Sequence, residues 1–153
     1  IYTPIDTKNP LLNAVINVEQ EKAVALNINF SIQIADEMIE FSENSDIVSI
    51  IGNMCDNAIE YLIKIDKINR KMWLKIYIHG NHYIVDCVNK VEKSILNENP
   101  NLLTSKTNEN HGKGIDILKS VAKKYDGEVN FFEKDGYFHS MIILKKQNLP
   151  NNK

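Results

Sequence analysis

The stretch Asn53-Met54-Cys55-Asp56-Asn57-Ala58-Ile59-Glu60-Tyr61 carries most of the information in this chain. At about 100° per residue, its apolar side chains fall on one face of a helix predicted to run from about Asp46 to Ile65. Asn53, Asn57, Glu60 and Lys64 form a narrow stripe beside that face. Asparagine has only modest helix propensity, so two on one stripe suggest a role for the amides. The alternative is a solvated flank in an Asn-rich chain.

A second motif, His111-Gly112-Lys113-Gly114-Ile115, follows some fifty residues later and precedes a predicted amphipathic helix. Glycines let a ligand approach the backbone closely. The free N–H groups and the dipole of a first helical turn favour an anion such as phosphate. The spacing is neither a P-loop nor Gly-x-Gly-x-x-Gly, and a flexible turn is the alternative interpretation.

The remaining patterns predict a two-layer α/β sandwich. Asn9-Pro10 indicates a helix start, and residues 28–34 alternate as a half-buried strand. Gly80-Asn81 and Asp135-Gly136 each join two alternating runs, which indicates hairpins, and Gly127 is expected as a left-handed C-cap. Strands in adjacent pairs favour a mixed, mostly antiparallel sheet with helices on one face. We expect a linker at 1–10, one domain at 11–146 and a flexible tail at 147–153.

Composition narrows the function classes. The 153 residues carry a formal net charge of −2, which gives no reason to expect a nucleic-acid or membrane-surface partner. No apolar run reaches the roughly 18–20 residues of a membrane span. We expect no signal peptide at the start of the chain, because Pro4 and Asp6 interrupt any apolar segment there. Cys55 and Cys87 are expected as buried free thiols in a reducing cytoplasm. Because the chain does not begin with Met, we expect a piece of something longer.

The central helix resembles a known motif. Asn53-x-x-x-Asn57-Ala58-Ile59-x-Tyr61 is similar to the N-box of the GHKL superfamily in its histidine-kinase form. His111-Gly112-Lys113-Gly114-Ile115 resembles its second glycine box, and Lys124-Tyr125-Asp126-Gly127 the close of the following helix. Thr104-Ser105-Lys106 resembles the subgroup of peptide-pheromone, or quorum-sensing, sensor kinases. The resemblance covers about Asp46 to Leu144, with blocks in matching order.

This resemblance implies a Bergerat fold that binds ATP and Mg²⁺, with the polar stretch of about 90–113 as a lid. Asn57 falls on the position that ligates Mg²⁺, which suits an ion that takes oxygen ligands and shares phosphate oxygens. The backbone of Gly112 and Gly114 would contact phosphate, together with His111, Lys113 and Lys106. Each of these three side chains could instead be a solvated charge or a cap of the turn.

Asn53 falls where related ATPases, and related serine kinases, carry a glutamate base. An amide cannot take a proton from water, so the chain looks poorly equipped for hydrolysis and better suited to a histidine acceptor, whose neutral imidazole is already nucleophilic. None of the four histidines in this chain fits as that acceptor. The resemblance therefore implies the catalytic half of a membrane-anchored sensor, cytoplasmic, with a separate histidine-bearing dimerisation domain and a response regulator downstream.

Two departures from the family pattern stand out. The first glycine box, Asp-x-Gly-x-Gly, is absent, and Val88-Asn89-Lys90 stands in its place. Asn89 is the candidate acceptor for the adenine amino group, with Asp86 a less suitable substitute. A neutral hydrogen bond is worth about 1 kcal/mol less than a charged one, which predicts weak ATP binding. Glu60 stands where such kinases often carry a basic residue, so Lys64 or Lys106 would supply that contact.

Two other functions stay open at this point. Loss of the first glycine box would suit a non-catalytic domain that keeps the fold for nucleotide or partner binding. A stand-alone ATPase is the third possibility, although it conflicts with the missing base at Asn53. We expect Trp73 to pack at the surface or in an interface. We expect Tyr61 to belong to the core, in preference to a contact with adenine.

Overall fold

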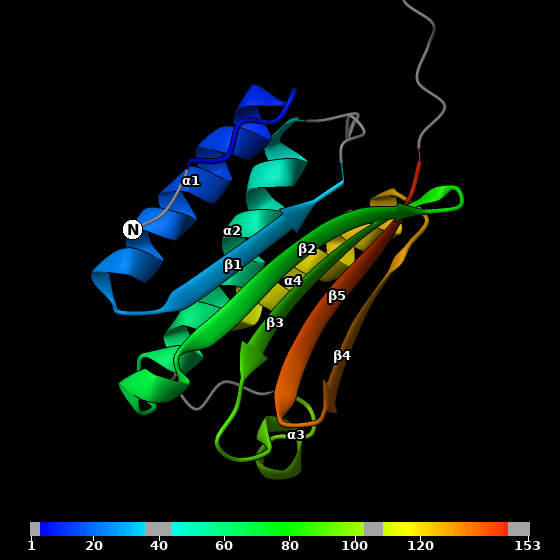
Figure 1. Ribbon diagram of the computed structural model, residues 1–153. Helices are drawn as coiled ribbons and strands as arrows, with labels where there is room; N and C mark the ends of the chain where they lie inside the picture. Colours follow the sequence, from blue (N-terminus) through cyan, green and yellow to red (C-terminus); the bar gives the residue numbers. More distant parts are fainter. Residues whose placement is uncertain (1–3, 36–43, 103–108, 147–153) are drawn as a thin grey trace, which may run out of the picture.

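A computed structural model describes residues 4–35, 44–102 and 109–146 (Figure 1). One strand lies between the first two long helices, and the other four strands follow in two consecutive pairs. The elements are α1 (Pro10–Ala25), β1 (Asn29–Ile34), α2 (Asn44–Leu62), η1 (Lys67–Asn69), β2 (Lys71–His79), β3 (His82–Lys90), α3 (Ile95–Glu98), α4 (Glu109–Lys124), β4 (Glu128–Lys134) and β5 (Tyr137–Lys145). Within these ranges no helix is long and apolar enough to cross a membrane.

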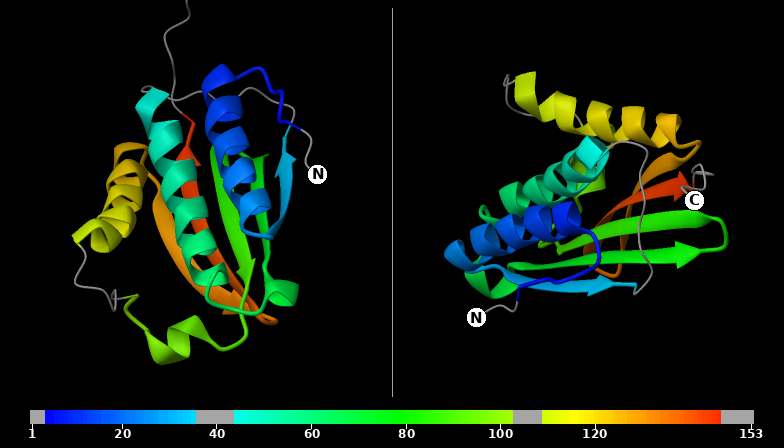
Figure 2. Two further views of the ribbon diagram at one scale, coloured as in Figure 1. Left: turned by 90° about the vertical axis from the view of Figure 1, so that its left-hand side faces the viewer. Right: turned by 90° about the horizontal axis from the view of Figure 1, so that it is seen from above.

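The strands form one five-stranded sheet in the order β1-β2-β3-β5-β4. β1 pairs with β2 in parallel, and the other three pairs are antiparallel. α1, α2 and α4 lie on the same side of this sheet, as the views from the side and from above show (Figure 2). The predicted two-layer sandwich, with a mixed and mostly antiparallel sheet, is therefore confirmed.

The core lies between this sheet and the helices. Alternate residues of the strands, such as Leu74 and Leu144, are fully buried and belong to one hydrophobic cluster with Ile50 and Met54 of α2. Each such side chain contributes about 1.5–3 kcal/mol relative to an exposed position. Cys55 and Cys87 are both buried and free, as the sequence predicts.

The predicted caps and turns hold in most places. Asn9 caps α1, because its Oδ1 accepts hydrogen bonds from the N–H groups of Leu11 and Leu12. Residues before it lie along α1, where the Ile5 N–H donates to Asn17 Oδ1 at 2.8 Å. Asp135 and Gly136 both have positive φ, 53° and 83°, as a type I′ hairpin turn requires.

The end of α2 departs from prediction. The helix stops at Leu62, short of the expected Ile65. The Arg70 guanidinium accounts for this end, since it donates to the carbonyl oxygens of Ile63 at 3.0 Å and Ile65 at 3.2 Å. A third bond reaches the Leu26 carbonyl just after α1. One side chain therefore satisfies carbonyls that helix ends leave without partners.

The prediction for Gly127 as a left-handed C-cap is wrong. Asp126 takes the left-handed conformation with φ 50°, and Gly127 does not. Gly127 is needed for another reason: a Cβ at this position would overlap the carbonyl oxygen of Ile143 on β5. The close approach lets the chain turn from α4 directly into the edge of the sheet.

The far ends of α2 and α4 are joined by polar contacts. Asp46, in the first turn of α2, accepts hydrogen bonds from the Tyr125 hydroxyl at 2.6 Å and from Lys124 Nζ at 2.9 Å. These bonds place the two helices antiparallel, so that the start of α4 faces the middle of α2.

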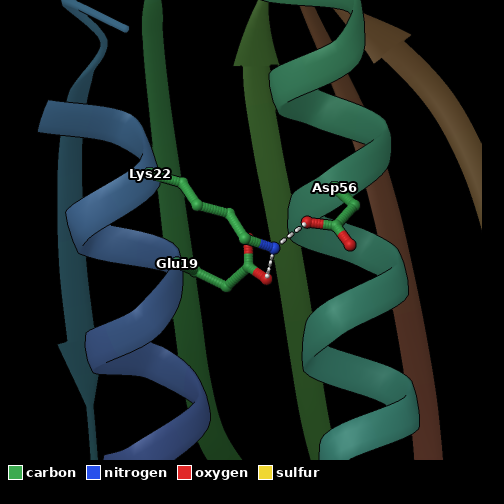
Figure 3. A network of polar contacts seen from close by, with 3 residues as sticks. All are labelled: Glu19, Lys22 and Asp56. Carbon is green, nitrogen blue, oxygen red and sulfur yellow. Dashed lines mark hydrogen bonds and ion pairs between the residues drawn. The ribbon is translucent and has the colours of Figure 1, made fainter. Parts of the chain in front are cut away.

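A buried carboxyl lies between α1 and α2 (Figure 3). Lys22 Nζ is 3.0 Å from Glu19 Oε1 and 3.0 Å from Asp56 Oδ1 on α2. Glu19 is only 2% exposed, and its Oε2 has no hydrogen-bond partner among the described residues. Burial, followed by the hydrogen bond with the Asp56 carboxyl, raises the pKa of Glu19 to about 7.

This carboxyl predicts a pH dependence of stability. The pKa of Glu19 is higher in the folded chain than the ordinary 4.5, so the folded state holds the proton more tightly. The free energy of unfolding should therefore fall as pH rises from about 4.5 through about 7, by on the order of 3 kcal/mol. Urea unfolding between pH 4.5 and 8 measures it. Glu19→Gln should flatten this decline, whereas Glu98→Gln, at an exposed carboxyl of α3, should retain it; an equal decline in Glu19→Gln would contradict the assignment.

Candidate functional site

The asparagine stripe lies along α2 as predicted, at the edge of the core. Asn53 and Asn57 are both partly exposed, while Met54 and Ala58 next to them are buried. Asn53 Nδ2 donates to the Ser49 carbonyl oxygen, one turn earlier, at 2.6 Å. Because this bond holds the NH₂ group against the helix, the Oδ1 atom is left to face away from it.

The start of α4 packs against this stripe. A Cβ built on Gly114 would lie 3.2 Å from Asn53 Oδ1 and 3.8 Å from both amide atoms of Asn57. A side chain at residue 114 would crowd Asn53 Oδ1, which would have to shift by a few tenths of an ångström. The structure thus brings together three sequence-predicted residues from motifs about sixty positions apart.

The boundary of this helix corrects the sequence interpretation. α4 begins at Glu109, so His111, Gly112, Lys113 and Gly114 lie inside its first two turns and not before it. The physical reason is that residues 109–111 tolerate a helix, and an acidic first residue is favoured by the helix dipole. The free N–H groups therefore belong to residues at or just before Gly112.

Other predicted site residues are only partly placed. Lys106 lies outside the described residues, as does the Thr104-Ser105 pair before it. For His111 and Lys113 the backbone position in α4 is described, and their side chains are not. Asn53, Asn57 and Gly114 are therefore the residues on which a geometric argument about α2 and α4 rests.

Asn89 lies on the helix-facing side of β3, two residues after Cys87, which contacts the Met54 carbonyl on α2. Its side chain is 4% exposed, and its Nδ2 donates to the Lys90 carbonyl oxygen at 3.2 Å. Asp86 has the opposite orientation and approaches His139 Nδ1 at 3.1 Å on the other face of the sheet. The sheet therefore separates Asp86 from Asn53 and Asn57, which removes it as a substitute for Asn89.

The segment after β3 is anchored by contacts that sequence reasoning missed. The Glu92 N–H donates to the Tyr61 hydroxyl at 3.1 Å. Glu133 on β4 accepts hydrogen bonds from Ser94 Oγ at 2.6 Å and from the N–H groups of Ile95 and Leu96. Ser94 before a helix is a capping signal, but a partner 39 residues away leaves no local pattern. Burial raises the pKa of Glu133, and these hydrogen bonds outweigh it and lower that pKa.

A cavity of about 300 Å³ opens beside the start of α4, between the segment that includes α3 and the edge strand β4. Its lining includes Leu96, Ile115, Lys119 and Phe131. Neither Asn53, Asn57 nor Asn89 lines it. The cavity therefore adjoins the asparagine stripe through Ile115, the neighbour of Gly114, without coinciding with it.

The donor chemistry of the stripe suits only some metals. No cluster of three or more His, Cys, Asp or Glu side chains suitable for a metal ion occurs in the described ranges. The amide oxygens of Asn53 and Asn57 are hard oxygen donors. They fit an ion such as Mg²⁺, which accepts few protein ligands and keeps waters and phosphate oxygens for the rest.

Comparison with known families settles the class of domain. The sequence matches the GHKL domain family over residues 42–145, which is more than half of the chain. The chain belongs to the GHKL domain family. The match begins just before α2 and ends at the last residue of β5, so it includes every element that forms the asparagine stripe and its surroundings.

Solved structures share the fold of this GHKL domain. The catalytic domain of the histidine kinase ThkA in a nucleotide-free form superposes with a TM-score of 0.73 at 17% identity, covering 92% of this chain and 93% of that one. The Acinetobacter baumannii histidine kinase AdeS gives 0.65 at 11% identity, covering 90% and 64%. No curated protein matches the sequence.

Proposed function

We propose that this GHKL domain is the catalytic domain of a sensor histidine kinase, which binds Mg²⁺-ATP and passes the γ-phosphoryl group to a histidine on a separate domain. The contact of Gly114 with Asn53 and Asn57 carries the proposal. It brings oxygen donors for a metal next to the start of a helix, where N–H groups favour phosphate. Phosphoryl transfer needs this kind of positioning more than covalent chemistry.

Each residue has a distinct role in the proposal. Asn57 would ligate Mg²⁺, and the free N–H groups of the first turn of α4, at or just before Gly112, would bind phosphate. Gly114 would leave room for the ligand beside Asn53 and Asn57. His111, Lys113 and Lys106 add contacts to the phosphates. Asn89 orients the adenine: because its Nδ2 is engaged by the Lys90 carbonyl, its Oδ1 is the atom available to accept from the adenine amino group.

The chemistry of Asn53 separates kinase from hydrolase. Its NH₂ group donates a hydrogen bond to the Ser49 carbonyl oxygen. Its remaining polar atom is an amide oxygen, which is too weak a base to take a proton from water. A water molecule in the site would therefore keep its proton, whereas a neutral imidazole needs no base to attack phosphorus. Mg²⁺, when bound, neutralises charge on the transferring phosphate.

Features outside the site support the same assignment. The structures with the same fold, ThkA and AdeS, are described as histidine kinases. Thr104-Ser105-Lys106 supports a parent among the peptide-pheromone sensors. Such a parent would be anchored in a membrane, with this domain in the cytoplasm and a response regulator as the next acceptor.

The isolated domain should bind ATP and scarcely label itself. Calorimetric titration with ATP should give weak binding that strengthens when Mg²⁺ is added, because the metal links Asn57 to the phosphates. Incubation with ATP labelled in the γ-phosphate should leave the domain unlabelled, because the acceptor histidine of the proposal lies on a separate domain.

These two measurements, together with an assay of phosphate release, distinguish the alternatives. If calorimetry detects no heat of binding up to millimolar nucleotide, the domain is a non-catalytic module. The absence of the first glycine box is the sequence feature that suggests this alternative. Steady phosphate release that falls in Asn53→Ala would favour an ATPase. Stable label on a histidine of this chain would overturn the separation of catalytic and acceptor domains.

A further inference from the structure

The sheet face turned away from the helices is uncovered by any described element (Figure 2). We call it the open face. Side chains alternate along a strand, so the open face carries Lys71, Trp73 and Lys75 of β2 and the residues that the register places beside them on β3, β5 and β4. It carries the lysines Lys71, Lys75, Lys90, Lys134 and Lys145, which the register distributes over four neighbouring strands.

The open face carries a positive net charge, although the net charge of the whole chain is negative. Asp86 and Glu128 are its acidic residues, which leaves a formal charge of +3 against five lysines. The whole chain has a net charge of −2, so the remainder carries −5. Asp86 is also 5% exposed and bonded to His139, so it presents little negative charge to a partner.

Three of the five lysines lie at one end of this face. Tyr137 pairs with Lys90 on one side and with Lys134 on the other. The register that pairs Met72 with Asn89 brings Lys71 next to Lys90. Like charges on neighbouring strands are destabilising, and none of these three ammonium groups forms a salt bridge within the described residues. An anionic partner would relieve this repulsion.

Aromatic side chains lie beside these lysines on the open face. Trp73 and Tyr137 pack edge to face with ring centroids 5.3 Å apart, and Phe132 stacks on His139 at 4.5 Å. Tryptophan and tyrosine surrounded by a charged rim are typical of the anchor residues in protein–protein interfaces.

The same features argue against other anionic partners. Phe132 and His139 cover each other's ring faces and Trp73 packs against Tyr137, whereas single-stranded nucleic acid needs open faces for its bases. The sequence pI of about 6.1 also contrasts with the basic character of nucleic-acid binders. Ile84 and Val88 are 9% and 5% exposed, so they do not protrude to insert into a membrane.

We propose that the open face is a docking surface for a protein segment rich in aspartate and glutamate. The carboxylates contact Lys71, Lys75 and Lys90, and the aromatic pair of Trp73 and Tyr137 packs against the backbone between them. This surface is separated by the thickness of the sheet from Asn53, Asn57 and Asn89. Its occupation is therefore independent of the nucleotide proposal.

Trp73 makes the surface directly observable, because it is the only tryptophan in the chain. The full chain is titrated with poly-L-glutamate at low salt, with emission of Trp73 and ¹H–¹⁵N shifts of the backbone as readouts. Saturable changes in Trp73 emission, with shifts concentrated on β2, β3 and β5, are the expected result. Binding should weaken roughly tenfold or more when the salt is raised to screen the lysines.

Charge reversal tests the position. Lys71→Glu with Lys75→Glu should weaken poly-L-glutamate binding at least about tenfold and leave the calorimetric titration with ATP unchanged. Lys119→Glu with Lys123→Glu, exposed on α4, is the matched control and should retain binding. Backbone spectra confirm that both double variants are folded.

Three outcomes would overturn the proposal. Equal weakening by the two double variants would show attraction to the overall charge and not to this face. No change in Trp73 emission at saturation would place the contact elsewhere. Tighter binding of an oligothymidylate, or of vesicles containing phosphatidylglycerol, through the same residues would replace the acidic protein segment by another class of partner.

Discussion

Gly127→Ala is expected to destabilise the domain by roughly 3 kcal/mol or more. An added Cβ would overlap the Ile143 carbonyl oxygen and crowd the backbone of Leu144. Backbone atoms in the middle of a sheet cannot move aside as a flexible side chain can. The junction of α4 and β4 must therefore shift, and with it the pairing of β4 with β5. Urea unfolding of the parent and the variant measures the loss.

Gly52→Ala is the matched control for this substitution. Gly52 lies within α2, and nothing lies within 4 Å of the Cβ it would gain. Alanine in a helix interior is favoured over glycine, so this variant should gain about 0.5–1 kcal/mol. Opposite signs for the two substitutions are the expected pattern. An unfolding midpoint for Gly127→Ala equal to that of the parent would contradict the close approach to β5.

Asn57→Ala is expected to remove most of the magnesium-dependent ATP affinity, a loss of roughly 100-fold. The amide oxygen of Asn57, beside Gly114, is the proposed ligand, and the methyl group of alanine has no atom that can coordinate Mg²⁺. Affinity measured with a chelator present should change little, because Asn57 acts through the metal. Calorimetry with and without Mg²⁺ separates the two quantities.

The fold should survive this substitution, since alanine is the better helix former at a partly exposed position. Asn130→Ala removes an exposed amide on β4 and should leave both affinities at the parent's values. If Asn57→Ala still bound ATP more tightly with Mg²⁺ than without it, the metal would have another ligand. The proposed role of Asn57 would then be abandoned, while membership of the GHKL family would stand.

Local patterns predicted the layers of this fold well. The alternation in residues 28–34, the two hairpin turns and the apolar side of α2 each follow from contacts within a few residues. The failures have non-local causes. The end of α2 depends on Arg70, which bonds to carbonyls at both Ile63 and Leu26. The need for glycine at position 127 comes from the close approach of the Ile143 carbonyl oxygen. Ile143 lies on β5, and no local sequence pattern indicates that the two residues are neighbours.

The candidate site divides in the same way. The spacing of Asn53 and Asn57 places both amides on one stripe, and that much follows from helical periodicity. The start of α4 at Glu109 was not predicted, because two glycines within five residues favour a loop by propensity alone. The anchoring of Ser94 by Glu133 was also missed, since it joins residues 39 positions apart.

The hydrogen bonds of Asp46 with Tyr125 and Lys124 hold one end of α4, so the helix can act as a lever about that end. They tie the C-terminal end of that helix to α2, while Gly114 lies eleven residues away at the other end. At 1.5 Å per residue the arm is about 16 Å long. A tilt of about 5° around this pivot moves Gly114 by roughly 1.4 Å relative to Asn53 and Asn57. Small rotations at the fulcrum therefore become displacements as large as a bond length at the asparagines.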